Sequence, residues 1–126
     1  MPEHEPGTQP HSEPQHRVEL VPNSATIHVL VDGRTVAKSS NTLLARETNH
    51  AEVSYFPRDD VHCDLLEKTE HQTFCPFKGT ASYWTLRVGE RTLENAVWSY
   101  EEPFDDVAGL KDYLAFYADR VEWRSS

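Results

Sequence analysis

The sequence predicts a mostly β protein of the α+β class, with a compact, curled, barrel-like antiparallel sheet of hairpins and a C-terminal α-helix packed on it. Two dipeptides, Asp32-Gly33 and Gly89-Glu90, each separate two runs rich in β-branched and aromatic residues, and such dipeptides are typical of two-residue hairpin turns. After Pro103, apolar residues recur every three or four positions, which indicates a helix with one buried face. The lack of strand–helix alternation argues against a parallel nucleotide-binding sheet.

The 126 residues suit one domain with a modest core. Residues 1–24 are rich in proline, Glu and His and contain few apolar residues, which predicts a disordered acidic tail. Residues 25–126 are predicted to form a single β-rich domain that ends in the helix.

Composition narrows the function classes. A formal net charge of −9 argues against nucleic acid and anionic membranes as partners, because both need clustered Lys and Arg. No apolar run approaches the ~20 residues of a membrane span, and no apolar signal-peptide core is visible. A cytoplasmic protein is therefore expected, with Cys63 and Cys75 as free thiols. Its oligomeric state stays open.

The first part of the domain is predicted to consist of short strands. In the first hairpin, the two-residue turn places Val29 opposite Val36. Polar turn residues and Pro57 separate the next segments. The strands predicted before the centre of the chain are Ile27–Val31, Arg34–Lys38, Thr42–Glu47, Glu52–Phe56 and Val61–Leu66.

The second hairpin, Ala81–Val88 with Arg91–Tyr100, indicates a site. Its turn is expected to set Leu86 opposite Leu93 and Trp84 opposite Asn95. Because side chains alternate along a strand, one face then carries Trp84, Leu86, Leu93 and Val97 and belongs to the core. The other face carries Tyr83, Arg87, Glu94, Trp98 and Tyr100. Aromatic side chains mixed with single charges are typical of a ligand-site lining.

The stretch Thr73–Trp84 is predicted to place a lysine at the mouth of that hairpin. Pro76 and Gly79 restrict the chain to a tight turn around Lys78. We therefore expect a pocket that is lined by aromatic side chains, is rimmed by Lys78 and Arg58, and binds a small polar or anionic molecule. The predicted ligand-binding residues are Tyr55, Arg58, Lys78, Tyr83, Trp98 and Tyr100.

Several motifs occur together in a recognisable order: Tyr55–Val61 (YFPRDDV), Cys75–Gly79 (CPFKG), Ala81–Trp84 (ASYW), Asn95–Tyr100 (NAVWSY) and Phe116-Tyr117. They resemble a bacterial family catalogued as domain of unknown function 427, sometimes labelled nucleotidyltransferase-like. The resemblance covers about residues 27–123 and implies a compact β-rich domain with no established substrate. The transferase label is disfavoured, because nucleotidyl transfer needs paired carboxylates around Mg²⁺ and a glycine-rich phosphate cradle. Adjacent Asp59 and Asp60 would point to opposite faces of a strand, and no glycine-rich loop is visible.

Other functions remain open from the sequence. A small enzyme could use Cys75 as a nucleophile, activated by Lys78, or Lys78 as a base. The alternative is that Cys75 is a small buried side chain and Lys78 an exposed turn residue. Glu47 is either an acid or base or an edge-strand carboxylate, and Arg58 either binds an anion or pairs with Asp60.

A protein-interaction module would use the Tyr83/Trp98 face as its contact patch. Residues of ligand type are present, but His71-x-x-x-Cys75 is the only close spacing among them, and no metal site is predicted. No cofactor is indicated by the sequence.

Overall fold

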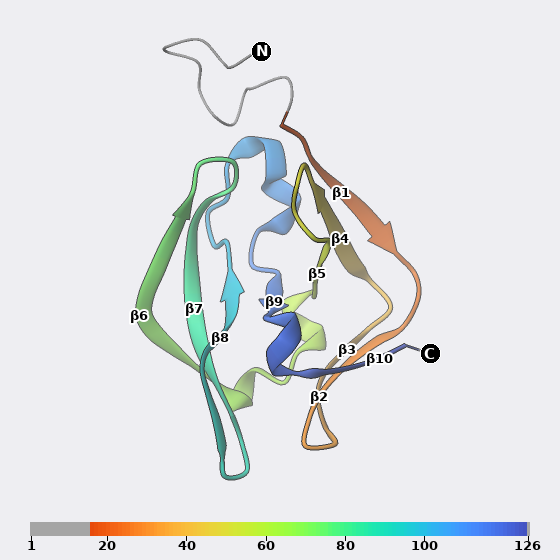
Figure 1. Cartoon of the computed structure of the whole chain (residues 1–126), viewed down its shortest axis with the longest axis vertical. Coiled ribbons are helices and arrows are strands. Elements are labelled where there is room, and N and C mark those ends of the chain that lie inside the picture. Colours follow the sequence, from red (N-terminus) through yellow and green to blue (C-terminus); the bar gives the residue numbers. More distant parts are fainter. Residues whose placement is uncertain (1–15, 126) are drawn as a thin grey trace.

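Three antiparallel sheets form the described part of the chain, residues 16–125, in a computed structural model (Figure 1). The first sheet has the order β1-β4-β5, with β1 (Val18–Asn23), β4 (Thr42–Glu47) and β5 (Val53–Tyr55). The second has the order β10-β2-β3, with β2 (Ile27–Val31), β3 (Arg34–Ser39) and β10 (Glu122–Ser125). The third has the order β6-β7-β8-β9, with β6 (Leu66–Cys75), β7 (Gly79–Val88), β8 (Arg91–Ser99) and β9 (Leu114–Phe116). The mostly β class is confirmed, but the sheets do not close into a barrel.

The predicted C-terminal helix is wrong. Asp105–Leu110 (η4) and Ala118–Arg120 (η5) form 3₁₀ turns, and β9 lies between them. Val107 has non-helical φ and ψ angles inside η4, and Asp112 has a φ of 64°. The apolar spacing still reports burial, since Val107, Leu110 and Leu114 are all in the core. Apolar residues that recur every three or four positions are compatible with one helix and also with 3₁₀ turns joined by a short strand, so the spacing alone does not distinguish the two.

The predicted tail extends too far. Its last residues form β1, which pairs with β4 from Val18 opposite Glu47 to Asn23 opposite Thr42. Val18 and Leu20 alternate with exposed Glu19, as in a half-buried strand. Pro22 is tolerated because β1 is an edge strand. Residues 1–15 of the predicted tail lie outside the described residues.

The first hairpin turn forms as expected, because Asp32 and Gly33 both have positive φ angles, 50° and 80°. A bulge between Val29 and Leu30 nevertheless sets Val29 opposite Ala37 rather than Val36. In the second hairpin, Leu86 lies opposite Leu93 as predicted.

An irregularity between Trp84 and Leu86 shifts the rest of the second hairpin. Trp84 lies opposite Val97 rather than Asn95, which adopts a φ of 51°. Three residues of β8, 94–96, thus lie opposite the single residue Thr85 of β7. The excess of two is even, so the side chains on either side of the irregularity keep their faces. Within it the alternation is interrupted, since Ala96 and Val97 both pack in the core of Trp84. The two predicted faces are therefore correct although the predicted pairing is not.

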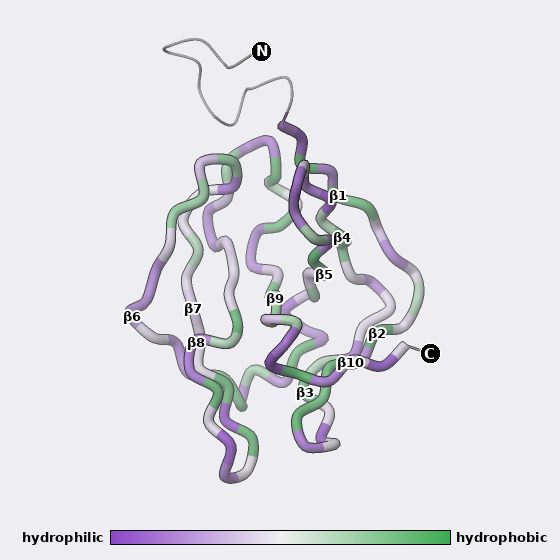
Figure 2. Tube along the Cα trace, viewed as in Figure 1, coloured by the Kyte–Doolittle hydropathy of each residue, from purple (hydrophilic) through white to green (hydrophobic). Residues whose placement is uncertain are grey.

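The segment from Val61 to the turn that contains Lys78 also differs from expectation. Val61 makes only an isolated bridge with Ala37, and the 3₁₀ turn Cys63–Leu65 (η3) replaces the predicted short strand. The polar residues that follow form β6, a long edge strand that is mostly exposed and hydrophilic (Figure 2). A strand that is exposed on this scale has no apolar alternation, so the sequence pattern missed it.

Two hydrophobic cores lie against the four-stranded sheet. One contains Trp84, Leu86 and Val97 and packs against β2 and β3. The other contains Tyr83, Tyr100 and Tyr55 and packs against β4 and β5. The second core is rich in tyrosine, and it forms the floor of the candidate site. Among the described residues, no helix has the length and apolar character needed to cross a membrane.

Candidate functional site

A cleft of about 530 Å³ opens between the β4–β5 edge, the face of β7 and β8, and the turn that contains Lys78. Five of the six predicted ligand-binding residues line it, namely Tyr55, Lys78, Tyr83, Trp98 and Tyr100. Cys75 lines it as well. The alternation along β7 and β8 explains this, since Tyr83 and Trp98 are paired and point to the same side. Their role in binding stays a prediction.

Arg58 does not belong to this cleft, and its predicted place at the rim is wrong. Its guanidinium carbon lies 5.4 Å from the ring centroid of Trp84, which faces the other core. Arg58 lies in the 3₁₀ turn Arg58–Asp60 (η2), on the opposite side of the four-stranded sheet from Tyr83. The sequence could not place this side chain, because β5 ends at Tyr55 and Arg58 begins the next 3₁₀ turn, so the alternation of the strand does not extend to it.

Lys78 is held in the cleft by its backbone. Its amide donates to the carbonyl of Cys75 at 3.2 Å, and its carbonyl accepts from the amide of Phe104 at 3.0 Å. Gly79 follows with a φ of 115°, a conformation that favours glycine, and a Cβ there would lie 3.4 Å from the carbonyl oxygen of Glu102. The alternative of an exposed turn lysine is therefore wrong, because Lys78 is 8% exposed.

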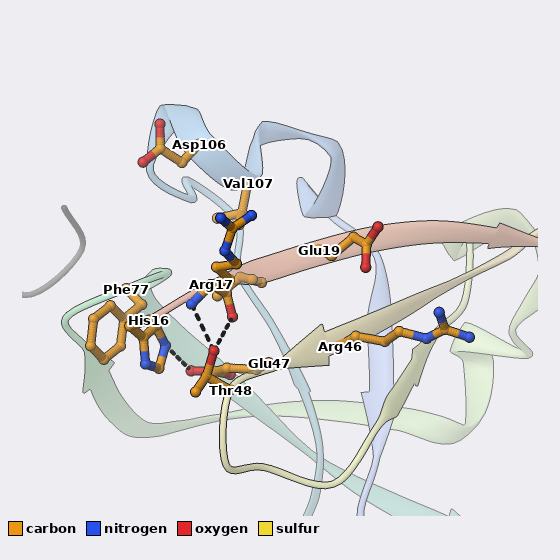
Figure 3. Close-up of a pocket in the computed structure, with 10 residues that line it drawn as sticks. His16, Arg17, Glu19, Arg46, Glu47, Thr48, Phe77, Asp106 and Val107 are labelled. Atoms are coloured by element: carbon orange, nitrogen blue, oxygen red, sulfur yellow. Dashed lines mark hydrogen bonds and ion pairs between the residues drawn. The ribbon is translucent and has the colours of Figure 1, made fainter. Parts of the chain in front are cut away.

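The partner of Lys78 is Glu47, the last residue of β4, and the two form a hydrogen-bonded ion pair. Their side chains are only 9% and 10% exposed. His16 Nε2 donates a hydrogen bond to Glu47 Oε2 at 2.9 Å (Figure 3). His50 Nε2 lies 3.7 Å from the same oxygen. Burial by itself raises the pKa of Glu47, but the hydrogen bonds and charge of these neighbours, Lys78 above all, bring the net pKa below its ordinary value. Glu47 is thus a carboxylate at neutral pH.

His16 and Phe77 form the wall behind this ion pair. Their rings stack with centroids 3.4 Å apart and an angle of 12° between the planes (Figure 3). Behind them lies a second, open hollow of about 610 Å³, whose lining includes Arg17, Thr48 and Asp106. Glu47 and Phe77 line both hollows, so His16, Phe77 and the carboxylate separate them.

The tyrosines are linked by ring contacts and hydrogen bonds. Trp98 Nε1 donates to the Tyr55 hydroxyl at 3.2 Å, with the two rings perpendicular. The Tyr83 hydroxyl lies 2.9 Å from Thr73 Oγ1, and the Tyr117 hydroxyl donates to that of Tyr83 at 3.5 Å. Burial raises the phenol pKa of Tyr55 and, with the nearby Tyr83 hydroxyl, raises that of Tyr117 to about 12. The phenols of Tyr55 and Tyr117 are therefore neutral donors and acceptors at physiological pH.

The two cysteines lie in different surroundings. Cys75 is half-buried in the cleft, and Cys63 is exposed on η3, where its thiol lies 3.7 Å from the carbonyl oxygen of Arg58. Both are free, as the sequence predicted.

The residues of the site that were not among the predicted ligand-binding residues include Glu47 and Tyr117 in the cleft lining and His16, which bonds to Glu47. The sequence left Glu47 open as an acid or base or as an edge-strand carboxylate, and a partner 31 positions away in the sequence leaves no local pattern. His16 was assigned to the tail, and the Val18-Glu19-Leu20 alternation was the only signal that a strand begins beside it. Tyr117 follows β9, whose residues were read as a helix.

The cleft has a polar end, formed by the Lys78–Glu47 ion pair, and mostly aromatic walls. Glu47 is the single carboxylate in its lining, so the paired carboxylates that nucleotidyl transfer needs are not gathered there. Lys78 and Glu47 offer a donor and an acceptor side by side, with little net charge. The remaining walls are mostly aromatic and aliphatic.

Residues 19–125 match a family described as a domain of unknown function, DUF427, whose model carries the short name NTP_transf_9. No curated protein matches the chain.

Proposed function

The chain belongs to the DUF427 family, and from the geometry of its cleft we propose that it binds a small polar molecule that is uncharged at its head and has an apolar or aromatic body. One observation carries this proposal: a nearly buried Lys78–Glu47 ion pair closes one end of a cleft whose other walls are aromatic. Ligand sites typically combine a mostly apolar lining with a few convergent polar groups.

The ion pair favours a head group with both a donor and an acceptor. A carboxamide can donate from its NH₂ group to Glu47 while its carbonyl oxygen accepts from Lys78. An anion gains from Lys78 but is repelled by Glu47, and a cation meets the reverse situation. The anionic ligand that Lys78 alone suggested is thus less favoured once Glu47 is placed beside it.

The aromatic walls favour a flat or apolar body. Trp98 and Tyr55 are perpendicular, with centroids 6.2 Å apart, and the Trp98 and Tyr117 rings are 4.8 Å apart. Such surfaces bind apolar groups by burial and by ring contacts. The pocket is concave, which supports ligand binding over the flat contact patch expected of a protein-interaction module.

The experiment that tests the proposal compares three ligands of equal length: butanamide, butanoate and butylamine. Each is titrated into the ¹⁵N-labelled full chain, and chemical-shift changes give the dissociation constants. The amide is expected to bind the wild type most tightly. Glu47→Gln should shift the preference to butanoate by freeing Lys78, and Lys78→Met should shift it to butylamine by freeing Glu47.

The matched control is the ion pair between Arg87 and Glu67. Its atoms lie 2.8 Å apart, but the side chains are 57% and 61% exposed and lie away from the cleft. Glu67→Gln should leave all three affinities unchanged. Equal affinities in the wild type, with no change of preference in the Lys78 and Glu47 variants, would refute the proposal.

A second candidate function is a small enzyme, favoured by the position of Cys75 in the same cleft as Lys78. Alkylation by iodoacetamide near neutral pH tests it, because a nucleophilic Cys75 should react faster than the exposed Cys63 in the same molecule. Slower reaction of Cys75 than of Cys63 excludes it. The free cysteines support the further proposal of a cytoplasmic location.

A further inference from the structure

We propose that the ligand is amphipathic and elongated, and that its apolar tail lies in a groove between β5 and β9 beside the cleft. This inference rests on the proposed function, because it extends the same site. Its starting point is the position of the exposed large apolar side chains. Among the described residues these are Phe74, Tyr117 and Trp123, which are 66%, 39% and 37% exposed. Phe74 and Tyr117 line the cleft, and Tyr117 and Trp123 line the groove.

The groove exists because two edge strands diverge. Phe56, just after β5, and Leu114, the first residue of β9, exchange two backbone hydrogen bonds of 2.8 Å. No further pairing joins β5 to β9 among the described residues. The strands separate from that bridge onward and leave a hollow of about 390 Å³.

The lining of the groove suits an uncharged apolar chain. Its walls are formed by Val53, Trp98, Phe116 and Trp123, with alanines at the rim. Glu52 is the one charged residue in the lining; it is 55% exposed and pairs with Arg46 at 3.0 Å. A charged tail would therefore find no buried partner here, whereas an alkyl chain would be removed from water along its length.

The groove continues the cleft. The two hollows share Ala51, Val53, Trp98 and Tyr117 in their linings. The Trp98 and Tyr117 rings are 4.8 Å apart and form the boundary between them. A ligand with its head at Lys78 would thus pass over these rings and reach Trp123. Exposed apolar side chains that follow one path mark a binding surface more clearly than scattered ones do.

The test is a chain-length series of butanamide, hexanamide and octanamide, titrated into the ¹⁵N-labelled full chain. Affinity should rise about two- to fourfold per added methylene, as expected for burial of an alkyl chain. The three tryptophan indole signals report position. Trp98 should respond to every amide, Trp123 only to the longer ones, and Trp84, which faces the other core, to none.

Ala118→Phe blocks the groove, since Ala118 is an exposed groove residue that does not line the cleft. The variant should bind hexanamide and octanamide no more tightly than butanamide, and its affinity for butanamide should equal that of the wild type. Ala25→Phe is the matched control, with the same change at an exposed position outside both hollows.

The two possible failures are distinguishable. If the amides bind but affinity does not rise with length, or if the rise persists in Ala118→Phe, the tail site is refuted and the head site stands. If octanamide binds without moving the Trp123 signal, the tail site is refuted in the wild type without reliance on any variant. If no amide binds, the proposed function itself fails.

Discussion

Replacing Lys78 by Met is expected to destabilise the fold, because it leaves the Glu47 carboxylate nearly buried without its main partner. Removing one member of a fully buried ion pair costs about 3–5 kcal/mol. Here both side chains are about one-tenth exposed and His16 remains bonded to Glu47, so the cost should lie at or just below the lower end of that range, at about 2–3 kcal/mol. For a domain of this size the melting temperature should fall by about 10 °C.

Urea unfolding followed by tryptophan fluorescence measures this change, with the free energy of unfolding extrapolated to water. The double variant Lys78→Met/Glu47→Gln should recover most of the loss, because the remaining amide carries no charge. Arg87→Met, which breaks an exposed ion pair, should cost no more than about 0.5 kcal/mol. If Lys78→Met matches Arg87→Met, or if the double variant shows no recovery, the ion pair does not contribute as argued.

Acid provides an independent check of the same pair. The folded state lowers the pKa of Glu47, so the stability that the pair contributes is present above the ordinary Glu pKa of about 4.3 and is lost as pH falls through the lowered value. In Lys78→Met, burial favours the protonated Glu47. The gap in unfolding free energy between wild type and Lys78→Met should therefore begin to narrow above pH 4.3, as Glu47 of the variant takes up a proton, and should narrow further as pH falls through the lowered wild-type pKa. A constant gap would contradict the assignment.

Three further predictions concern the surroundings of the site. Gly79→Ala should cost at least about 1 kcal/mol more than Gly89→Ala in urea unfolding, because the φ of 115° at Gly79 lies outside the left-handed region near 60° that Gly89 occupies and that alanine can adopt; equal costs would exclude this backbone constraint. A chain that starts at residue 24 should melt well below one that starts at residue 16, because it lacks β1; similar melting curves would mean that β1 does not support the sheet. The free energy of unfolding should fall above about pH 10, because burial raises the folded-state pKa of the Tyr55, Tyr100 and Tyr117 phenols while the unfolded chain ionises normally. An absorbance titration at alkaline pH measures the ionisation of these phenols, and phenols that all titrate near pH 10 in the folded protein would refute the prediction.

Local patterns predicted the parts of the fold that depend on neighbours in sequence. The Asp32-Gly33 and Gly89-Glu90 turns, the strand Thr42–Glu47 and the two faces of the second hairpin all follow from turn chemistry and alternation. The helix was wrong because its apolar spacing is shared by 3₁₀ turns that bury the same side chains. β6 was missed because an exposed edge strand needs no apolar residues.

The site was predicted in composition and only partly in geometry. Tyr83, Trp98 and Lys78 were found because they lie on one hairpin and the turn before it. Glu47 reaches Lys78 from the end of β4, and His16 reaches Glu47 from just before β1. These contacts depend on how the sheets are arranged. Arg58 shows the converse, since a cation close to Tyr55 in sequence lies on the other side of the sheet.

The even excess of residues in β8 affects which changes of length this sheet can accept. Residues 94–96 of β8 lie opposite the single residue Thr85 of β7, and the flanking side-chain faces are preserved because the excess is two. Deleting a pair of residues here would restore regular pairing and keep Trp98 toward the cleft. Deleting a single residue would turn Trp98 into the aliphatic core and expose Val97. Insertions and deletions compatible with a working cleft should therefore occur in β8 in steps of two.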